Sequence, residues 1–309
     1  MRKPSPPSAD AHRRGILQVA AAALLWGSLG VAGKFAFEAG LTPLAVAFYR
    51  ATLAFLVVAA VAVLGMPAAL RIRRADLWLF ALFGFISIAV FFFVYLYAVS
   101  KTTVATAAIL LYTAPAWVLV LSRLLFDEPL TRPKLWAVAL TFLGCLLVVR
   151  GYDLAALRLT LSGILAGLAS GLTYGLYSIL GKTALRRYPP QVTLTYALGF
   201  GSVFLGLAVV ATGQLNAQTL RAGWPIIAYL GLVTTLVAQF LYLSGLRHVE
   251  AGRASLIATL EPVVAALLGF VLLRERLDPI QIAGGAAVLS GVLMVRRAPV
   301  PPAELPPSG

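Results

Sequence analysis

Two stretches of the chain repeat one pattern: residues 105–129 read ATAAILLYTAPAWVLVLSRLLFDEP, and residues 252–279 read GRASLIATLEPVVAALLGFVLLRERLDP. Both stretches are apolar, and each has a proline near its middle, Pro115 in the first and Pro262 in the second. A proline inside a helix removes one backbone hydrogen bond, and in lipid the freed carbonyl needs another partner. The two prolines are therefore either static kinks or a pair of hinges that line a path, and their repetition favours hinges.

The composition is that of a membrane protein. Of the 309 residues, 61% are hydrophobic and 12% are charged, whereas soluble domains carry about 25% charged residues. A helix that crosses the bilayer needs roughly 20 apolar residues. We therefore expect an all-α integral membrane protein with ten transmembrane helices, at about 16–37, 43–64, 76–99, 104–126, 133–150, 161–183, 191–212, 224–246, 252–273 and 279–296.

The repeated pattern extends over most of the chain. A spacing of 147 residues recurs in the pairs Pro43/Pro190, Tyr95/Tyr242, Pro115/Pro262 and Glu128/Glu275. A constant offset indicates a duplicated unit, so the first five spans correspond to the last five. Because five is odd, the second copy enters the membrane from the opposite side. Inverted repeats of this kind are found in transporters whose binding site lies near the midplane.

The chain then divides into a disordered cytoplasmic tail (1–14), a first five-helix repeat (15–150), a second repeat (151–297) and a second disordered cytoplasmic tail (298–309). Lys and Arg concentrate in cytoplasmic loops. With the N-terminus inside, 17 of them fall on inner segments and six on outer segments, which predicts that both termini are cytoplasmic. The net charge of +14 lies in short clusters between apolar runs, which indicates contact with anionic lipid rather than nucleic acid.

Aromatic and polar side chains are interleaved within several spans, a combination typical of a cavity for amphipathic small molecules. The hydroxyl of any single residue can instead form a hydrogen bond to its own helix. The prediction of a cavity therefore rests on these residues taken together. Glu261 stands in mid-span, where it can accept a substrate ammonium or a proton, or serve as a structural carboxyl. The predicted cavity residues are Trp26, Ser87, Phe91, Tyr95, Tyr112, Tyr174, Tyr177, Tyr242, Thr259 and Glu261.

Four glycines in the sixth span, Gly163, Gly167, Gly171 and Gly175, recur at every fourth residue. Such a ridge lets a neighbouring helix approach closely, and it serves either as a packing seam or as a surface for sliding.

Three basic residues lie in or near spans. Lys34 and Lys182 are close enough to span ends to reach the interface. Arg50 is deeper and needs a partner, for which Glu38 is near in sequence. Glu128 and Glu275 are expected to start the fifth and tenth spans or to pair with nearby bases.

Enzyme motifs are absent from the sequence. The two histidines, His12 and His248, exclude an H-E-x-x-H metal site, and there is no G-x-x-x-x-G-K-[ST] phosphate loop. We therefore expect no catalytic residues, no metal and no cofactor.

The chain resembles the drug/metabolite transporter superfamily, and within it the EamA-type exporters. The resemblance rests on the ten spans in two repeats, the LWGS sequence at 25–28, the mid-span prolines, the Glu261–Pro262 step and the apolar runs that end at Glu128 and Glu275. The chain is most similar to the YddG-like amino-acid exporters. This resemblance implies a bacterial inner-membrane exporter, with Trp26, Tyr112 and Tyr174 around the cavity. One position departs from that group, which can have a tryptophan before the proline of the fourth span, where this chain has Ala114.

The sequence thus favours an exporter of amino acids and related metabolites that works by alternating access, with the substrate and the lipid bilayer as partners. The oligomeric state stays open, and a monomer is compatible with the pattern. One alternative is a sugar- or nucleotide-phosphate carrier of the same fold, which requires Lys34, Arg50 and Lys182 to converge in the cavity. Another is a non-transporting membrane scaffold.

Overall fold

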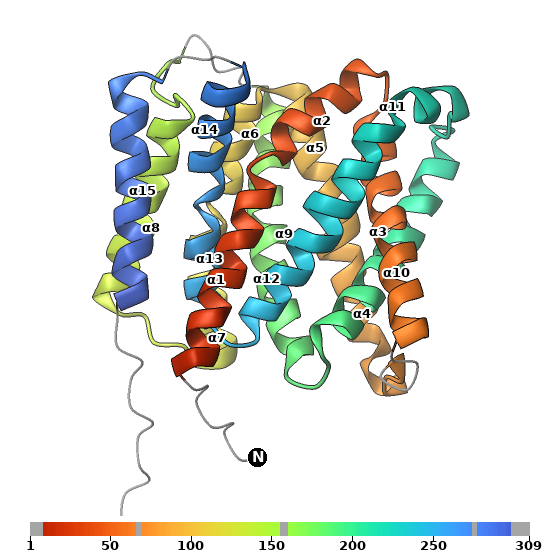
Figure 1. Ribbon diagram of the computed structural model, residues 1–309, viewed down its shortest axis with the longest axis horizontal. Coiled ribbons are helices and arrows are strands. Elements are labelled where there is room, and N and C mark those ends of the chain that lie inside the picture. The colour runs from red at the N-terminus through yellow and green to blue at the C-terminus, as the bar shows by residue number, and fades with distance from the viewer. Residues whose placement is uncertain (1–8, 66–69, 155–159, 274–276, 298–309) are drawn as a thin grey trace, which may run out of the picture.

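The computed structural model describes residues 9–65, 70–154, 160–273 and 277–297, and every regular element in these ranges is helical (Figure 1). The first half contains α1 (Ala9–Trp26), α2 (Leu29–Glu38), α3 (Pro43–Gly65), η2 (Arg74–Asp76), α4 (Leu77–Phe83), η3 (Gly84–Val90), α5 (Phe91–Lys101), α6 (Val104–Leu111), α7 (Ala114–Phe126) and α8 (Arg132–Val148). The second half contains α9 (Leu161–Leu185), α10 (Pro190–Ala211), α11 (Ala217–Tyr229), η4 (Leu230–Val237), α12 (Ala238–Leu246), α13 (Ala251–Ala258), α14 (Glu261–Leu273) and α15 (Pro279–Arg297).

The predicted fold class is confirmed. Eight helical segments in the described ranges are long and apolar enough to cross a membrane. The other two crossing segments are the shorter helices α8 and α15, of 17 and 19 residues. A rise of 1.5 Å per residue makes α8 about 25 Å long, close to the thickness of the hydrocarbon core. Together with α8 and α15, the described ranges thus hold the ten helical segments of two five-helix repeats.

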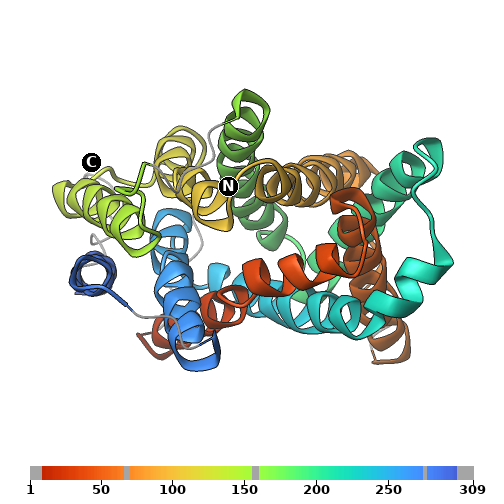
Figure 2. The ribbon, with the colours of Figure 1, turned by 90° about the horizontal axis from the view of Figure 1, so that it is seen from above.

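The two halves interlock. The helix α1 packs against α12, and α5 packs against α9, so each half contributes to the packing of the other. The helices α3 and α10 form a further pair, and α8 and α15 form a pair at one edge of the bundle (Figure 2). Each of these pairs joins one element from each half, which is the arrangement expected of an inverted repeat.

The regular helix is interrupted directly before each mid-span proline. Pro115 is the second residue of α7 and Pro262 the second residue of α14, so each begins a new helix. The missing N–H of a proline costs nothing in the first turn of a helix, because that N–H has no intrahelical acceptor. Two residues separate the half-helices in each case, at the positions where the sequence predicts a kink or a hinge. A third break, at Gly27 and Ser28, separates α1 from α2 without any proline.

Two π-helical segments occupy matching places in the two halves. The segments η3 and η4 begin at Gly84 and close to Gly231, and these glycines are 147 residues apart. Both glycines touch a facing helix: a Cβ at Gly84 would lie 2.5 Å from the Cβ of Phe200, and one at Gly231 would lie 2.9 Å from Leu53. A π-helix widens the hydrogen-bond ladder and redirects side chains, and it occurs frequently at functional sites.

The expected N-terminal tail is shorter than predicted. The helix α1 begins at Ala9, so residues 9–14 are helical. Close packing fixes this end, because a Cβ at Gly15 would lie 2.8 Å from Val249 and one at Gly245 would lie 2.5 Å from the Gly15 carbonyl. The remainder of the two predicted tails, 1–8 and 298–309, lies outside the described residues.

The contact between α8 and α15 generates a prediction. A Cβ at Gly284 would lie 2.7 Å from the Cβ of Leu147 and 2.8 Å from the Gly144 carbonyl, whereas one at the adjacent Gly285 would meet only Val263 at 3.9 Å. We expect Gly284→Ala to destabilise the fold by about 1–3 kcal/mol through overpacking. Gly285→Ala should leave stability unchanged or raise it. Thermal unfolding of the two variants in detergent measures the difference, and equal midpoints would contradict the close contact.

Candidate functional site

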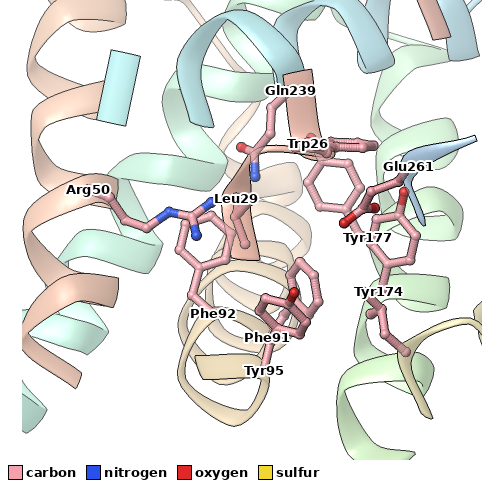
Figure 3. Close-up of a pocket in the computed structure, with 11 residues that line it drawn as sticks. Trp26, Leu29, Arg50, Phe91, Phe92, Tyr95, Tyr174, Tyr177, Gln239 and Glu261 are labelled. Atoms are coloured by element: carbon pink, nitrogen blue, oxygen red, sulfur yellow. The ribbon is translucent and has the colours of Figure 1, made fainter. Parts of the chain in front are cut away.

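A pocket at the centre of the bundle holds about 480 Å³ of empty space, including space open to solvent (Figure 3). Helices from both halves line it, so the site belongs to the interface between the repeats. The lining is mainly aromatic, with a few polar and charged groups, as in most small-molecule sites. The lining residues are Trp26, Leu29, Arg50, Phe91, Phe92, Tyr95, Leu111, Tyr174, Tyr177, Gln239 and Glu261.

Trp26 connects the break between α1 and α2 to the π segment η4. It is the last residue of α1 and is buried. Its indole N–H donates to the Thr234 carbonyl in η4, with 3.0 Å between Nε1 and the oxygen. Its ring packs against Tyr174 and Tyr242, with centroids 5.8 and 5.2 Å away. The irregular helix geometry on both sides therefore fixes the tryptophan in the cavity wall.

An aromatic cluster forms one wall of the cavity. Phe91 stacks on Tyr174 with centroids 5.4 Å apart, and Tyr177 stacks on Tyr174 with centroids 6.5 Å apart. Tyr242 packs behind these rings, and its hydroxyl lies 2.7 Å from the Ser178 hydroxyl. The sequence predicted that Tyr242 lines the cavity. Tyr242 is instead fully buried and is not among the lining residues, so it supports the wall.

Three buried polar atoms of the lining have no hydrogen-bond partner among the described residues. They are the hydroxyl oxygens of Tyr174 and Tyr177 and the Oε1 atom of Gln239. A buried polar atom without a partner is costly, and native proteins satisfy most such atoms. Seven other buried side-chain atoms of the described residues also lack a partner, but these three lie at the cavity, where a polar ligand can supply the missing bonds.

Charged side chains stand on opposite sides of the cavity (Figure 3). Glu261 is the first residue of α14, directly after the helix break. Arg50 on α3 is 3% exposed, donates from Nε to Thr235 Oγ1 over 2.8 Å, and lies 4.1 Å from the centroid of Phe92. The suggested pairing of Arg50 with Glu38 is therefore wrong, because the hydroxyl of Thr235 and the face of Phe92 hold the guanidinium instead.

A wider cavity adjoins the central one. Its volume is about 1760 Å³, including space open to solvent, and it shares Trp26, Tyr95 and Glu261 with the central cavity. Tyr112 and Pro262 also line it. It extends to Arg150, Asp278 and Gln281, near the ends of α8 and α15 that lie opposite the start of α1 (Figure 1). The site is thus open toward one end of the bundle.

Polar contacts connect α8 and α15 at this open end. The hydroxyl of Tyr152 donates to Asp278 over 2.5 Å, and this bond lowers the pKa of the Asp278 carboxyl, with the backbone amide of Gln281 and Arg150 acting in the same direction. The side-chain amide of Gln281 donates to the Val148 carbonyl over 2.8 Å. These bonds fix the rim of the wide cavity.

The opposite end is held by Glu128. Its two carboxylate oxygens accept from the backbone amides of Ala251 and Gly252, over 2.9 and 3.2 Å. Glu128 therefore caps α13 in the other repeat, where the helix dipole favours a negative charge. The sequence suggested that it starts the fifth span or pairs with a base, and the structure corrects this. Glu275 lies outside the described residues.

A second acidic residue, Glu250, forms ion pairs at the same end of the bundle as Glu128. Glu250 binds Lys134 over 3.1 Å and Arg253 over 2.8 Å. Burial raises the pKa of Glu250, but Lys134 and Arg253 outweigh it and hold the pKa below its usual value. Lys182 donates to the carbonyls of Leu246 and Val249 at the same end.

The other predicted residues have different surroundings. Ser87 is buried within η3, and the Thr259 hydroxyl donates to the Leu256 carbonyl over 2.6 Å. Neither residue lines the central or the wider cavity. The glycines of α9 lie along α5, α6 and α7. A Cβ at Gly163 would meet Thr102, at Gly167 Leu110, at Gly171 the Leu110 carbonyl, and at Gly175 Trp117.

Five lining residues were not among the predicted cavity residues: Leu29, Arg50, Phe92, Leu111 and Gln239. Arg50 and Gln239 did carry a signal in the sequence, because both are polar residues inside an apolar span. The three apolar residues carried none.

Two interlocked halves, broken helices and a central polar–aromatic cavity define a membrane transporter of the inverted-repeat type. The sequence profile of the EamA-like transporter family matches residues 13–150 and 161–297. The chain therefore belongs to the EamA-like transporter family, whose members have two repeats of five helices.

Individual proteins agree with this assignment. The chain is 33% identical to an uncharacterized transporter of Archaeoglobus fulgidus over 288 residues, which cover 92% of this chain and 97% of that protein. It is 24% identical to an uncharacterized inner membrane transporter of Salmonella typhimurium, over 92% of this chain and 95% of that protein. A solved structure with 18% identity shares the fold, with a TM-score of 0.77 over 91% of this chain and 95% of that one.

The Glu128 contact generates a prediction. We expect Glu128→Gln to speed amide hydrogen exchange in the first turn of α13, because the neutral side chain retains one acceptor oxygen and loses the charge. The loss should be about 1–3 kcal/mol of local stability. Asp127→Asn is a charge-matched control, since Asp127 is exposed and asparagine tolerates its positive φ of 56°. Equal exchange at Ala251 and Gly252 in both variants would contradict the capping role.

Proposed function

We propose that this protein exports amino acids and related small metabolites across a bacterial inner membrane by alternating access. Membership of a transporter family supports a transport function. The observation that carries the substrate class is Glu261, an acidic side chain in mid-span that faces the cavity and has no ion-pair partner in the described part of the chain. A carboxylate held among aromatic rings suits a substrate ammonium.

The distribution of Lys and Arg supports an orientation with both termini in the cytoplasm. In that orientation the wide cavity opens to the periplasm, and the Glu128 contact with α13 closes the cytoplasmic end. The arrangement is then the outward-open state of the cycle. Return to the inward-open state requires that Glu128 releases the amides of Ala251 and Gly252.

The helix breaks supply the flexure that this cycle needs. A break leaves two half-helices joined by one or two residues, so each half can tilt separately. Pro115 and Pro262 prevent the break from closing into a continuous helix, because neither can donate a hydrogen bond across it. The glycines of α9 bring α6 and α7 close to its backbone, and this seam is the proposed surface along which those helices move. Pro115 and Pro262 are thus the proposed hinges.

Three residues support the YddG-like assignment within the family. Trp26 and Tyr174 line the central cavity and contact one another, and Tyr112 lines the wider one. Ala114, where that group can have tryptophan, is buried near Gly175 of α9 and lines neither cavity. The departure at this position therefore leaves the cavity lining intact.

The phosphate-carrier alternative requires three converging basic groups. Only Arg50 faces the cavity. Lys34 is exposed on α2, and Lys182 donates to two backbone carbonyls at the cytoplasmic end. A non-transporting scaffold would have no use for a central cavity with unpartnered polar groups. Both alternatives are thus less well supported than amino-acid export.

A counterflow experiment tests the proposal. Purified protein in liposomes should accelerate exchange of labelled amino acids. Trp26→Ala and Tyr174→Ala should each reduce exchange about tenfold, because each removes an aromatic contact worth about 1 kcal/mol or more. Trp136→Ala is the matched control, since Trp136 is 68% exposed on α8. The proposal fails if no amino acid exchanges, or if the cavity variants behave like the Trp136 control.

A further inference from the structure

Arg50 is a buried cation without an acidic partner. It is 3% exposed, and the described residues place no carboxylate within 4 Å of its guanidinium. Burying a charge is costly unless it is paired or hydrogen-bonded. The matching position of the second repeat, 147 residues on, is Ala197, so the repeat architecture does not require a cation here. The positive charge therefore calls for a separate explanation.

The protein holds Arg50 by one nitrogen. The hydroxyls of Thr234 and Thr235 both reach the Leu230 carbonyl, over 2.9 and 2.7 Å, because η4 has a widened helical turn. Thr235 Oγ1 is left with lone pairs that accept from Nε of Arg50. The face of Phe92 supports the guanidinium plane at 4.1 Å. These two contacts orient the side chain without neutralising it.

The other donors of Arg50 remain available. A guanidinium has five N–H groups, and within the described residues only the one on Nε has an acceptor. The remaining four form a planar fork at the edge of the central cavity (Figure 3). Such a fork matches the two oxygens of a carboxylate. Gln239, whose Oε1 is buried and unpartnered, lies on the same side of the cavity in Figure 3.

The far side of the cavity has the opposite charge. Glu261 lies there together with Tyr174 and Tyr177, whose hydroxyls have no partner among the described residues (Figure 3). The rings of Phe91 and Tyr95 lie between the two sides. The cavity thus presents a cation, an aromatic middle and an anion.

We propose that the central cavity selects zwitterions, with the guanidinium of Arg50 binding the substrate carboxylate while the carboxylate of Glu261 binds its ammonium. This inference rests on the proposed export of amino acids and adds a second charged contact to it. Selection follows from the two fixed charges. An amine without a carboxylate leaves Arg50 unpaired and is repelled by it, and an acid without an amine leaves Glu261 unpaired. A phosphate ester meets the same repulsion at Glu261.

A ligand series tests the proposal on the unaltered protein. The probes are leucine, its decarboxylated amine 3-methylbutylamine and its deaminated acid 4-methylpentanoate, with phenylalanine, phenethylamine and 3-phenylpropionate as a second series. Each is measured as a competitor of amino-acid counterflow in liposomes. We expect each singly charged analogue to compete at least about tenfold more weakly than its amino acid, because it leaves one buried charge unpaired.

Two variants assign each half of this selectivity. Arg50→Gln should abolish the preference for the amino acid over the amine and keep the preference over the acid. Glu261→Gln should abolish the preference for the amino acid over the acid and keep the preference over the amine. Thr52→Val, on the same helix but turned about 200° from Arg50, serves as a control that keeps both preferences.

The outcomes separate this inference from the proposed function. If amino acids exchange but their amines compete equally well with the unaltered protein, the role of Arg50 is wrong and amino-acid export stands. If Arg50→Gln lowers competition by amino acid and amine to the same extent, Arg50 supports the fold and does not bind the carboxylate. If none of the six probes competes and no amino acid exchanges, both proposals fail.

Discussion

The need to satisfy every backbone hydrogen bond inside a bilayer constrains this structure more than any other requirement. Non-helical backbone is tolerated in the membrane only where protein or an aqueous cavity surrounds it. Three spans are interrupted in the described part of the chain, and these interruptions lie against other segments of protein. Gly27 approaches the Glu261 carbonyl, and Gly171 of α9 approaches the Leu110 carbonyl. The broken segments therefore gather at the centre, which is where the cavity forms.

The functional groups are departures from the symmetry of the repeat. Glu261 corresponds to Ala114 and Arg50 to Ala197, so each charge occurs in one half only. The first span is broken into α1 and α2, whereas its counterpart α9 is continuous over 25 residues. The repeat supplies two halves that pack against one another, and the unmatched residues give the cavity its charges.

Sequence patterns predicted the spans and the aromatic wall, because apolar length and side-chain type are local properties. They did not predict the long-range contacts. Glu128 caps a helix that begins 123 residues later in the chain, and nothing near it in the sequence indicates that partner. The sequence predicts that Arg50 lies within a span and needs a partner. It does not predict the partner Thr235, because the position of that hydroxyl depends on the π geometry of η4. The prolines predicted a kink or a hinge in each span, and the interruption of the helix before Pro115 and Pro262 agrees with either.

The central claim is that the two ends of the bundle open in turn around one cavity. Pulsed electron paramagnetic resonance on paired spin labels tests it directly. One pair joins Lys34 on α2 to Ile280 on α15 at the open end, and the other joins Leu77 on α4 to Arg132 on α8 at the closed end; all four residues are exposed. The account predicts that substrate shortens the first distance and lengthens the second in the same sample. Distances that stay unchanged during exchange, or that change in the same direction, would contradict it.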